Sequence, residues 1–353
     1  MKKIKSTLFT LLTLISFTSL AQTDVAIGDS TVLDRAKSEA FYNAGIEKFN
    51  NKNLQGAIND FDSALILIPD FEKALFNRGS IKYQLNDYKG AIEDFSEVIK
   101  LNPDSNNAYF LRGRSYQALN KDEEAKQDFN NAIKINNKNA EAYYYRGGYY
   151  FIEEKYKEAI TDYDNAIKNK PNHAYAYNDR GSAKRQLNDL EGAIQDYKKA
   201  ISIDPNLSFI HNNLGSAYRN NKQYDEAIQS YSKAISLKDD YYIAYNNRGL
   251  AKLEKGEYEE AIKDFNDAIR LKASYVYAYN NRAAAKYKME DYKGAIADCN
   301  KALILKDDYA AAYLNRGIAR ELIRKQDEAC EDWSKAASLG LKNGKIFSQQ
   351  ACD

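Results

Sequence analysis

The sequence predicts an all-α solenoid of nine helical hairpins, because one 34-residue pattern recurs along most of the chain. The copies follow one another without a gap and begin at Ser38, Glu72, Asn106, Ala140, Ala174, Ser208, Tyr242, Val276 and Ala310. Each copy has the spacing of two short amphipathic helices joined by a turn. We number the copies 1 to 9 and the positions within a copy as places 1 to 34.

Small and bulky residues keep the same places in nearly every hairpin, and all the prolines share one place. Place 8 is Gly except for Ala283, place 20 is always Ala, and place 27 is Ala except for Val98. Place 24 supplies bulk to fill the space between the two helices: Phe61, Phe95, Phe129, Tyr163, Tyr197, Tyr231, Phe265, Cys299 and Trp333. The four prolines all stand at place 32, where a proline ends the second helix: Pro69, Pro103, Pro171 and Pro205.

This period and pattern resemble the tetratricopeptide repeat family over residues 38–343. The resemblance implies a right-handed superhelical solenoid of nine helix–turn–helix repeats. It also implies that places 2, 5, 6, 9, 12 and 13 of the first helices face a concave groove that binds another protein. The chain departs from the family at place 4, with aromatics such as Tyr245 and Tyr279 in place of Trp, and at place 7, with Arg in place of Leu.

The N-terminus predicts export. Lys2, Lys3 and Lys5 precede an apolar run from Leu8 to Leu20, which is short for a membrane span, and Ser19 and Ala21 form a small-x-small cleavage signature. We therefore expect residues 1–21 to be a cleaved signal peptide of bacterial type, with no membrane span in the mature chain, and the alternative is an uncleaved anchor. The expected destination is the periplasm or the cell exterior. Residues 22–37 are expected to be a short leader, with the first helix beginning near Asp34.

The C-terminal residues 344–353 are expected to cover the open end of the last copy, with Ile346 and Phe347 packing there. Cys330 stands at place 21, which is Ile in seven of the other eight copies, so it should face this tail. A disulfide between Cys330 and Cys352 would attach the tail, and the alternative is two free thiols. Cys299, at the bulky place, is expected to be an inert core thiol.

Arginine at place 7 and aspartate at place 23 recur together. The arginines are Arg78, Arg112, Arg146, Arg180, Arg248, Arg282 and Arg316, and copy 6 lacks both partners, with Leu214 and Ser230. If each aspartate pairs with the arginine of its own copy, eight of the nine copies have either both partners or neither. If it pairs with the arginine of the next copy, only six of eight pairs are complete, so the sequence favours pairs within a copy. A buried arginine needs such a carboxylate. The alternative is an arginine ladder that binds acidic ligands.

The predicted contact residues lie at places 5 and 6. Place 6 carries Asn43, Asn77, Asn213, Asn247, Asn281 and Asn315. Place 5 is aromatic in the first four copies and Asn in the next four: Tyr42, Phe76, Phe110 and Tyr144, then Asn178, Asn212, Asn246 and Asn280. Amides at this spacing can both donate to and accept from the backbone of an extended peptide. The alternatives are that the amides only cover a polar helix face and that the aromatics pack between helices.

Other function classes find little support in the sequence. The net charge is +1, which suggests neither nucleic acid nor an anionic membrane as a partner. The chain has two histidines, no glycine-rich phosphate loop and three cysteines without CxxC spacing, so we expect no catalytic site, metal or cofactor. The predicted function is a non-enzymatic scaffold that binds an extended polypeptide or partner protein. The alternatives are a periplasmic accessory subunit that positions a partner enzyme or envelope complex, and a structural role through end-to-end stacking.

Overall fold

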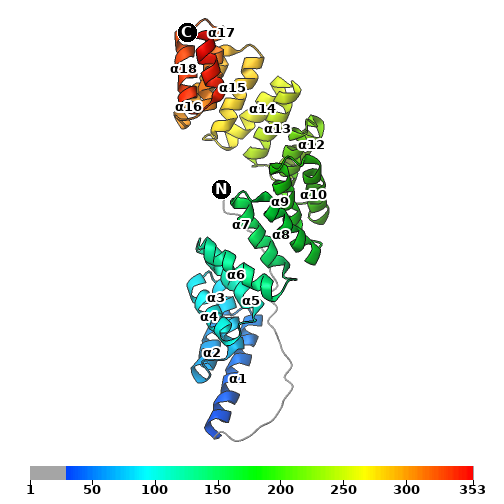
Figure 1. Ribbon diagram of the computed structural model, residues 1–353, viewed down its shortest axis with the longest axis vertical. Helices are drawn as coiled ribbons and strands as arrows, with labels where there is room; N and C mark the ends of the chain where they lie inside the picture. Colours follow the sequence, from blue (N-terminus) through cyan, green and yellow to red (C-terminus); the bar gives the residue numbers. More distant parts are fainter. Residues whose placement is uncertain (1–28, 353) are drawn as a thin grey trace. The chain divides into compact units, whose positions relative to one another are not determined.

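The computed structural model describes residues 29–352, which form nineteen α-helices and, within that range, no strand (Figure 1). The predicted signal peptide and residues 22–28 lie outside the described residues. The chain divides into two compact units between Pro171 and Asn172. Among the described residues no helix is both long and apolar enough to cross a membrane.

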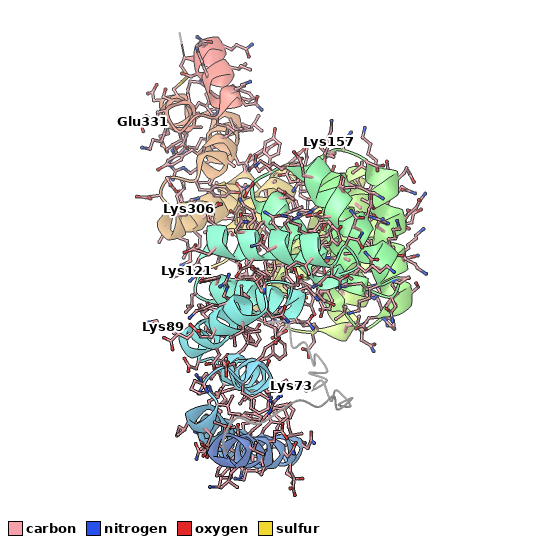
Figure 2. The ribbon with its side chains drawn as sticks, turned by 60° about the horizontal axis from the view of Figure 1, so that its bottom comes forward. Lys73, Lys89, Lys121, Lys157, Lys306 and Glu331 are labelled. Atoms are coloured by element: carbon pink, nitrogen blue, oxygen red, sulfur yellow. A yellow bond between two sulfur atoms is a disulfide. The ribbon has the colours of Figure 1, made fainter. Side chains whose placement is uncertain are left out.

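Unit 1 holds the first four hairpins. Its helices are α1 (Asp29–Asn50), α2 (Leu54–Leu67), α3 (Glu72–Gln84), α4 (Tyr88–Leu101), α5 (Asn106–Ala118), α6 (Asp122–Ile135), α7 (Ala140–Ile152) and α8 (Tyr156–Asn169). In Figure 2, Lys89 at the start of α4 and Lys121 just before α6 lie on one edge of this stack, and Lys73 at the start of α3 lies on the other edge. Helix α1 begins at Asp29, which corrects the expectation of a start near Asp34.

Unit 2 holds five hairpins and a final single helix. Its helices are α9 (Ala174–Gln186), α10 (Leu190–Ile203), α11 (Ser208–Asn220), α12 (Tyr224–Leu237), α13 (Tyr242–Lys255), α14 (Tyr258–Leu271), α15 (Val276–Lys288), α16 (Tyr292–Leu305), α17 (Ala310–Leu322), α18 (Gln326–Ser338) and α19 (Lys342–Ala351). From copy 2 to copy 9 the first helix begins at place 1. Place 15, between the two helices, is left-handed in every copy and is glycine only at Gly256.

Asparagine or aspartate at place 16 begins four of the second helices. The side chain accepts a hydrogen bond from the N–H at place 19, which satisfies one of the unpaired donors of the first turn. In these four copies place 19 is glycine, and at Gly56 a Cβ would lie 2.5 Å from the capping Asn53 side chain. The pairs are Asn53 with Gly56, Asp87 with Gly90, Asp189 with Gly192, and Asp291 with Gly294.

The core of each hairpin is the contact between places 8 and 24. All nine place-24 side chains are at most 1 % exposed. A Cβ added at Gly249 would lie 2.7 Å from Cε1 of Phe265, so only glycine lets the two helices approach this closely. Copy 8 is the exception on both sides of the contact, because Ala283 faces Cys299, the smallest of the place-24 residues. The methyl group of Ala283 therefore occupies part of the volume that a larger place-24 side chain fills in the other copies.

The C-terminal helix α19 covers the last hairpin as expected. The ring of Phe347 stacks on Trp333 with 5.3 Å between centroids, and Cys330 and Cys352 form a disulfide. The helix α18 ends before Gly340, whose φ of 88° is the left-handed value that favours glycine. Ile346 is 48 % exposed, so of the two residues expected to pack here, only Phe347 does.

The exception in copy 8 predicts a compensating pair of substitutions. Cys299→Phe should destabilise by about 1–3 kcal/mol, because the ring would overlap the methyl group of Ala283. Adding Ala283→Gly removes that methyl group and should make the double variant more stable than Cys299→Phe alone. Ala283→Gly alone, the control, should cost about 1 kcal/mol through lower helix propensity. Urea denaturation followed by circular dichroism gives the three values, and a double variant no better than Cys299→Phe would contradict the compensation.

Candidate protein-binding face

Places 5, 6, 9 and 12 of the first helices lie on one side of each helix, which we call the ladder face. In unit 2 every asparagine at place 6 donates a hydrogen bond from Nδ2 to Oδ1 of the asparagine at place 5 in the preceding copy. The four bonds are 2.9 or 3.0 Å long and join Asn213 to Asn178, Asn247 to Asn212, Asn281 to Asn246 and Asn315 to Asn280. The two rows of amides therefore form one hydrogen-bonded ladder across α9, α11, α13, α15 and α17.

The two rows of this ladder differ in exposure. The place-5 asparagines are buried, with exposed fractions of 3–7 %, whereas the place-6 asparagines of unit 2 are half-buried. This corrects the expectation that Asn178, Asn212, Asn246 and Asn280 contact a partner directly. They hold the place-6 amides in one orientation instead, because a buried amide oxygen needs a donor. The carbonyl oxygen of each place-6 amide can accept from a ligand, although that of Asn247 also accepts from Nδ2 of Asn246 at 3.4 Å.

Unit 1 has aromatic side chains where unit 2 has its buried amides. Each place-5 ring packs against the place-24 ring of its own copy, with centroids 5.7–6.0 Å apart for Tyr42, Phe76, Phe110 and Tyr144. The alternative that these aromatics pack between helices is thus confirmed for all four. That a partner also contacts these half-buried rings stays a prediction. Asn77 is 3 % exposed and donates to the hydroxyl of Tyr42, so its amide is not available for direct contact with a partner. Asn43 is exposed, and its contact with a partner stays a prediction.

The arginines of place 7 pair with the aspartates of their own copy, as predicted. Nε and Nη2 of Arg248 donate to the two carboxylate oxygens of Asp264, at 3.0 and 2.6 Å. The same two-bond pair occurs in all seven copies that have both residues. The aspartates are buried and their guanidinium partners are occupied, so this row is structural and the alternative of an arginine ladder for acidic ligands loses its basis.

The same arginines also connect neighbouring copies. The third guanidinium nitrogen, Nη1, donates to the side chain at place 25 of the preceding copy: Asp62, Ser96, Asn130, Ser232, Asn266 and Asn300. Copy 6, which has Leu214 at place 7, follows a copy with Lys198 at place 25, and Lys198 lies over the ring of Tyr218 at 5.5 Å. An arginine there would meet a like charge, so the loss of the pair in copy 6 has a local physical reason.

A second cation reaches the aspartate in most copies, but not in copies 3 and 4. Lys252 at place 11 lies 2.9 Å from Asp264, and Lys82, Lys184, Lys286 and Arg320 do the same in their copies. Copies 3 and 4 have Tyr116 and Tyr150 at place 11. In these two copies burial raises the pKa of Asp128 and Asp162 above the ordinary range, although the paired arginine opposes the shift.

One residue on the ladder face of unit 1, Arg114 at place 9, was not among the predicted contact residues. Its guanidinium carbon lies 3.8 Å from the ring centroid of Tyr145 and 6.0 Å from that of Tyr83. The signal was present, since place 9 is otherwise Ile, Ser, Gly, Leu or Ala and Arg114 is its single charge. A pocket of about 80 Å³ opens on the same unit beside Tyr42, Phe76 and Asn77.

The comparisons with known proteins agree with the repeat pattern. The family model described as TPR repeat matches residues 79–120, 181–222 and 251–290, and models described as tetratricopeptide repeat match 107–139, 140–173 and 208–241. Together these matches span more than half of the 353 residues. The comparison with curated proteins found no match.

Several solved structures are similar to this chain. A tetratricopeptide repeat protein from Parabacteroides merdae is 20 % identical with a TM-score of 0.59, over 70 % of this chain and 99 % of that one. The C-terminal part of a TPR repeat-containing protein from Cytophaga hutchinsonii is 23 % identical with a TM-score of 0.54, over 68 % and 98 %. MamA is 31 % identical with a TM-score of 0.42, over 47 % and 96 %. The first two likenesses show the fold.

The raised pKa of Asp162 predicts a pH-dependent gain from one substitution. Tyr150→Lys should place a second cation beside the carboxylate, as Lys252 does in copy 7, and lower the pKa of Asp162. A carboxyl group with a raised pKa in the folded state favours folding at low pH, and this contribution is lost as pH rises. The variant should therefore gain stability relative to the parent as pH rises from about 3 to 7.

Carboxyl-carbon NMR titration and urea denaturation across that pH range would measure the two effects. Tyr150→Met is the matched control, because it removes the same ring without adding a charge. If the lysine and methionine variants show the same pH dependence, the introduced ammonium group does not interact with the aspartate.

Proposed function

This chain belongs to the tetratricopeptide repeat family, and we propose that it is a non-enzymatic scaffold that binds an extended polypeptide along the ladder face of unit 2. Tetratricopeptide repeats commonly mediate protein–protein interactions, and stacked repeats present long surfaces suited to extended partners. The fold places Asn213, Asn247, Asn281 and Asn315 one copy apart on that face. Successive contacts can therefore follow a peptide from copy to copy.

The observation that supports this proposal most strongly is the bond between the two amide rows. A free asparagine side chain has several rotamers, and ordering it on binding costs conformational entropy. Here the buried place-5 amide has already fixed the place-6 amide, at 3.0 Å in the pair of Asn212 and Asn247. The carbonyl oxygen of each place-6 amide can accept from a peptide N–H. Because these contacts would be with the peptide backbone, we expect the face to tolerate many side-chain sequences.

We also propose that the protein acts outside the cytoplasm, in the periplasm or beyond. The basic and apolar N-terminal sequence supports this location, and so does the disulfide between Cys330 and Cys352, since disulfides persist in oxidising compartments. Mass spectrometry of the exported protein should find an N-terminus at Gln22 and a non-reduced peptide that links Cys330 to Cys352. Two free thiols at these positions would contradict the proposed oxidising location, whereas a retained Met1 would show that the N-terminal segment is an uncleaved anchor.

The ladder test uses variants that leave no buried amide unpaired. Replacing Asn247 alone would strand the buried oxygen of Asn212, at a cost of about 1–3 kcal/mol, and would confuse folding with binding. The pair Asn212→Phe with Asn247→Leu copies Phe76 and Leu111, which occupy the same two places in copies 2 and 3. Combined with Asn246→Phe and Asn281→Leu, it should keep the helical circular dichroism signal. It should weaken binding of short unstructured peptides at least about tenfold.

The peptide itself supplies the matched control for backbone contact. Peptides that are N-methylated at their backbone nitrogens lose the donors that the place-6 carbonyl oxygens would accept, so they should also bind at least about tenfold more weakly to the parent chain. Methylation should weaken binding to the four-residue variant less than it weakens binding to the parent, because the variant keeps only Asn213 and Asn315 of the four place-6 amides. Equal binding of methylated and unmethylated peptides to the parent would refute backbone recognition by the ladder.

A further inference from the structure

Arg114 is the one place-9 side chain that carries a charge, and its guanidinium group has no acidic partner. Among the described residues, no carboxylate lies within ion-pair distance of Arg114, and its buried Nε has no hydrogen-bond partner. The place-7 arginines differ, since Arg112 on the same helix donates to both oxygens of Asp128. Arg219, on the ladder face of unit 2, is also paired, because it lies 3.0 Å from Glu254. Arg114 therefore holds an unused set of N–H donors.

Aromatic rings hold this guanidinium group in place. Tyr83, Arg114 and Tyr145 come from α3, α5 and α7 and stand at places 12, 9 and 6, so they form a diagonal row across three neighbouring first helices. The guanidinium carbon lies 3.8 Å from the Tyr145 centroid, which is the distance of a close stacking contact. Stacking uses the face of the guanidinium plane. Because Arg114 is only half-buried, the N–H groups of its two terminal nitrogens, rather than the buried Nε, are left for another group.

The phenol groups beside Arg114 keep their protons and add no negative charge. Burial raises the pKa of Tyr145 to about 12 and also raises the pKa of Tyr83, although Arg114 lowers both. The positive charge of Arg114 is thus not neutralised by its neighbours at physiological pH. A buried or half-buried cation without a partner is costly, which favours a ligand that supplies the missing anion.

We propose that Arg114 binds a single carboxylate of an extended polypeptide, an Asp or Glu side chain flanked by apolar residues, on the ladder face of unit 1. This inference rests on the proposed scaffold function and names the partner chemistry of one part of it. The edge of a guanidinium group matches a carboxylate with two parallel hydrogen bonds. The rings of Tyr83 and Tyr145 offer apolar area to the residues on either side.

The charge balance selects an acidic side chain over a phosphate group. Arg114 is the only cation among the described residues that lies over the Tyr83 and Tyr145 rings. One guanidinium group matches the single charge of a carboxylate, whereas a phosphate group carries about −1.5 to −2 at neutral pH. The site is therefore committed to a side-chain carboxylate, and a phosphopeptide is one outcome of the test.

The test compares matched peptides that differ at one central residue. Unstructured peptides with Leu-Glu-Leu, Leu-Gln-Leu or Leu-phosphoSer-Leu at their centre are titrated into the purified full chain and its variants. The parent should bind the Glu peptide at least about tenfold more tightly than the Gln peptide, which is the expected gain from one charge-assisted contact. Arg114→Gln should remove this preference and leave binding of the Gln peptide unchanged. Arg114→Lys should keep part of it, because it retains the charge but loses the planar edge.

Arg219→Gln is the matched control, since it removes a ladder-face arginine that already has a carboxylate partner. It should keep the full preference for the Glu peptide, and circular dichroism should show all variants equally helical. A parent that binds Glu and Gln peptides alike would refute the role of Arg114 and leave the scaffold function standing. A preference for the phosphoserine peptide over the Glu peptide would overturn the choice of a carboxylate. If no peptide binds at all, both proposals are wrong.

Discussion

In each hairpin the side chain at place 24 lies directly against the small residue at place 8, and the separation of the two helices depends on this contact. The distance is short enough that a Cβ at Gly249 would meet Phe265 at 2.7 Å. Protein interiors are close-packed, so adding one methyl group at such a contact requires a neighbouring side chain to be smaller or to move. In copy 8 the extra methyl group of Ala283 is accommodated because the facing place-24 residue is the small Cys299.

Two rows of buried polar groups then join one hairpin to the next. On one side, the place-7 arginine pairs with its own aspartate and reaches back to place 25 of the preceding copy, as Arg248 does with Asp264 and Ser232. On the ladder face, the place-6 amide reaches back to place 5. Buried polar groups must be satisfied, so both rows favour one arrangement of neighbouring copies. A repeat protein gains its stability from such contacts between neighbours.

The ladder faces of the two units differ in their chemistry. In unit 2 the polar ladder is continuous and its acceptors are uncharged, which suits a peptide backbone. In unit 1 the same places carry rings, and the single charge at place 9 is Arg114, stacked on Tyr145 and without an acidic partner. The first arrangement favours tolerance of sequence and the second favours selection of one side chain. If both proposals hold, the scaffold binds a family of partners that share one acidic position.

The sequence by itself determined the fold class, the register of the hairpins and their core, because the places of Gly, Ala, Pro and the bulky residues repeat with one period. It also predicted the within-copy Arg–Asp pairs, since Leu214 and Ser230 lose both partners together. Only the tertiary structure decided which of two adjacent asparagines is buried. Neighbouring residues on a helix point about 100° apart, and the adjoining helix of the next copy covers one of them. Arg114 needed the structure for the same reason, because its neighbours Tyr83 and Tyr145 come from other copies.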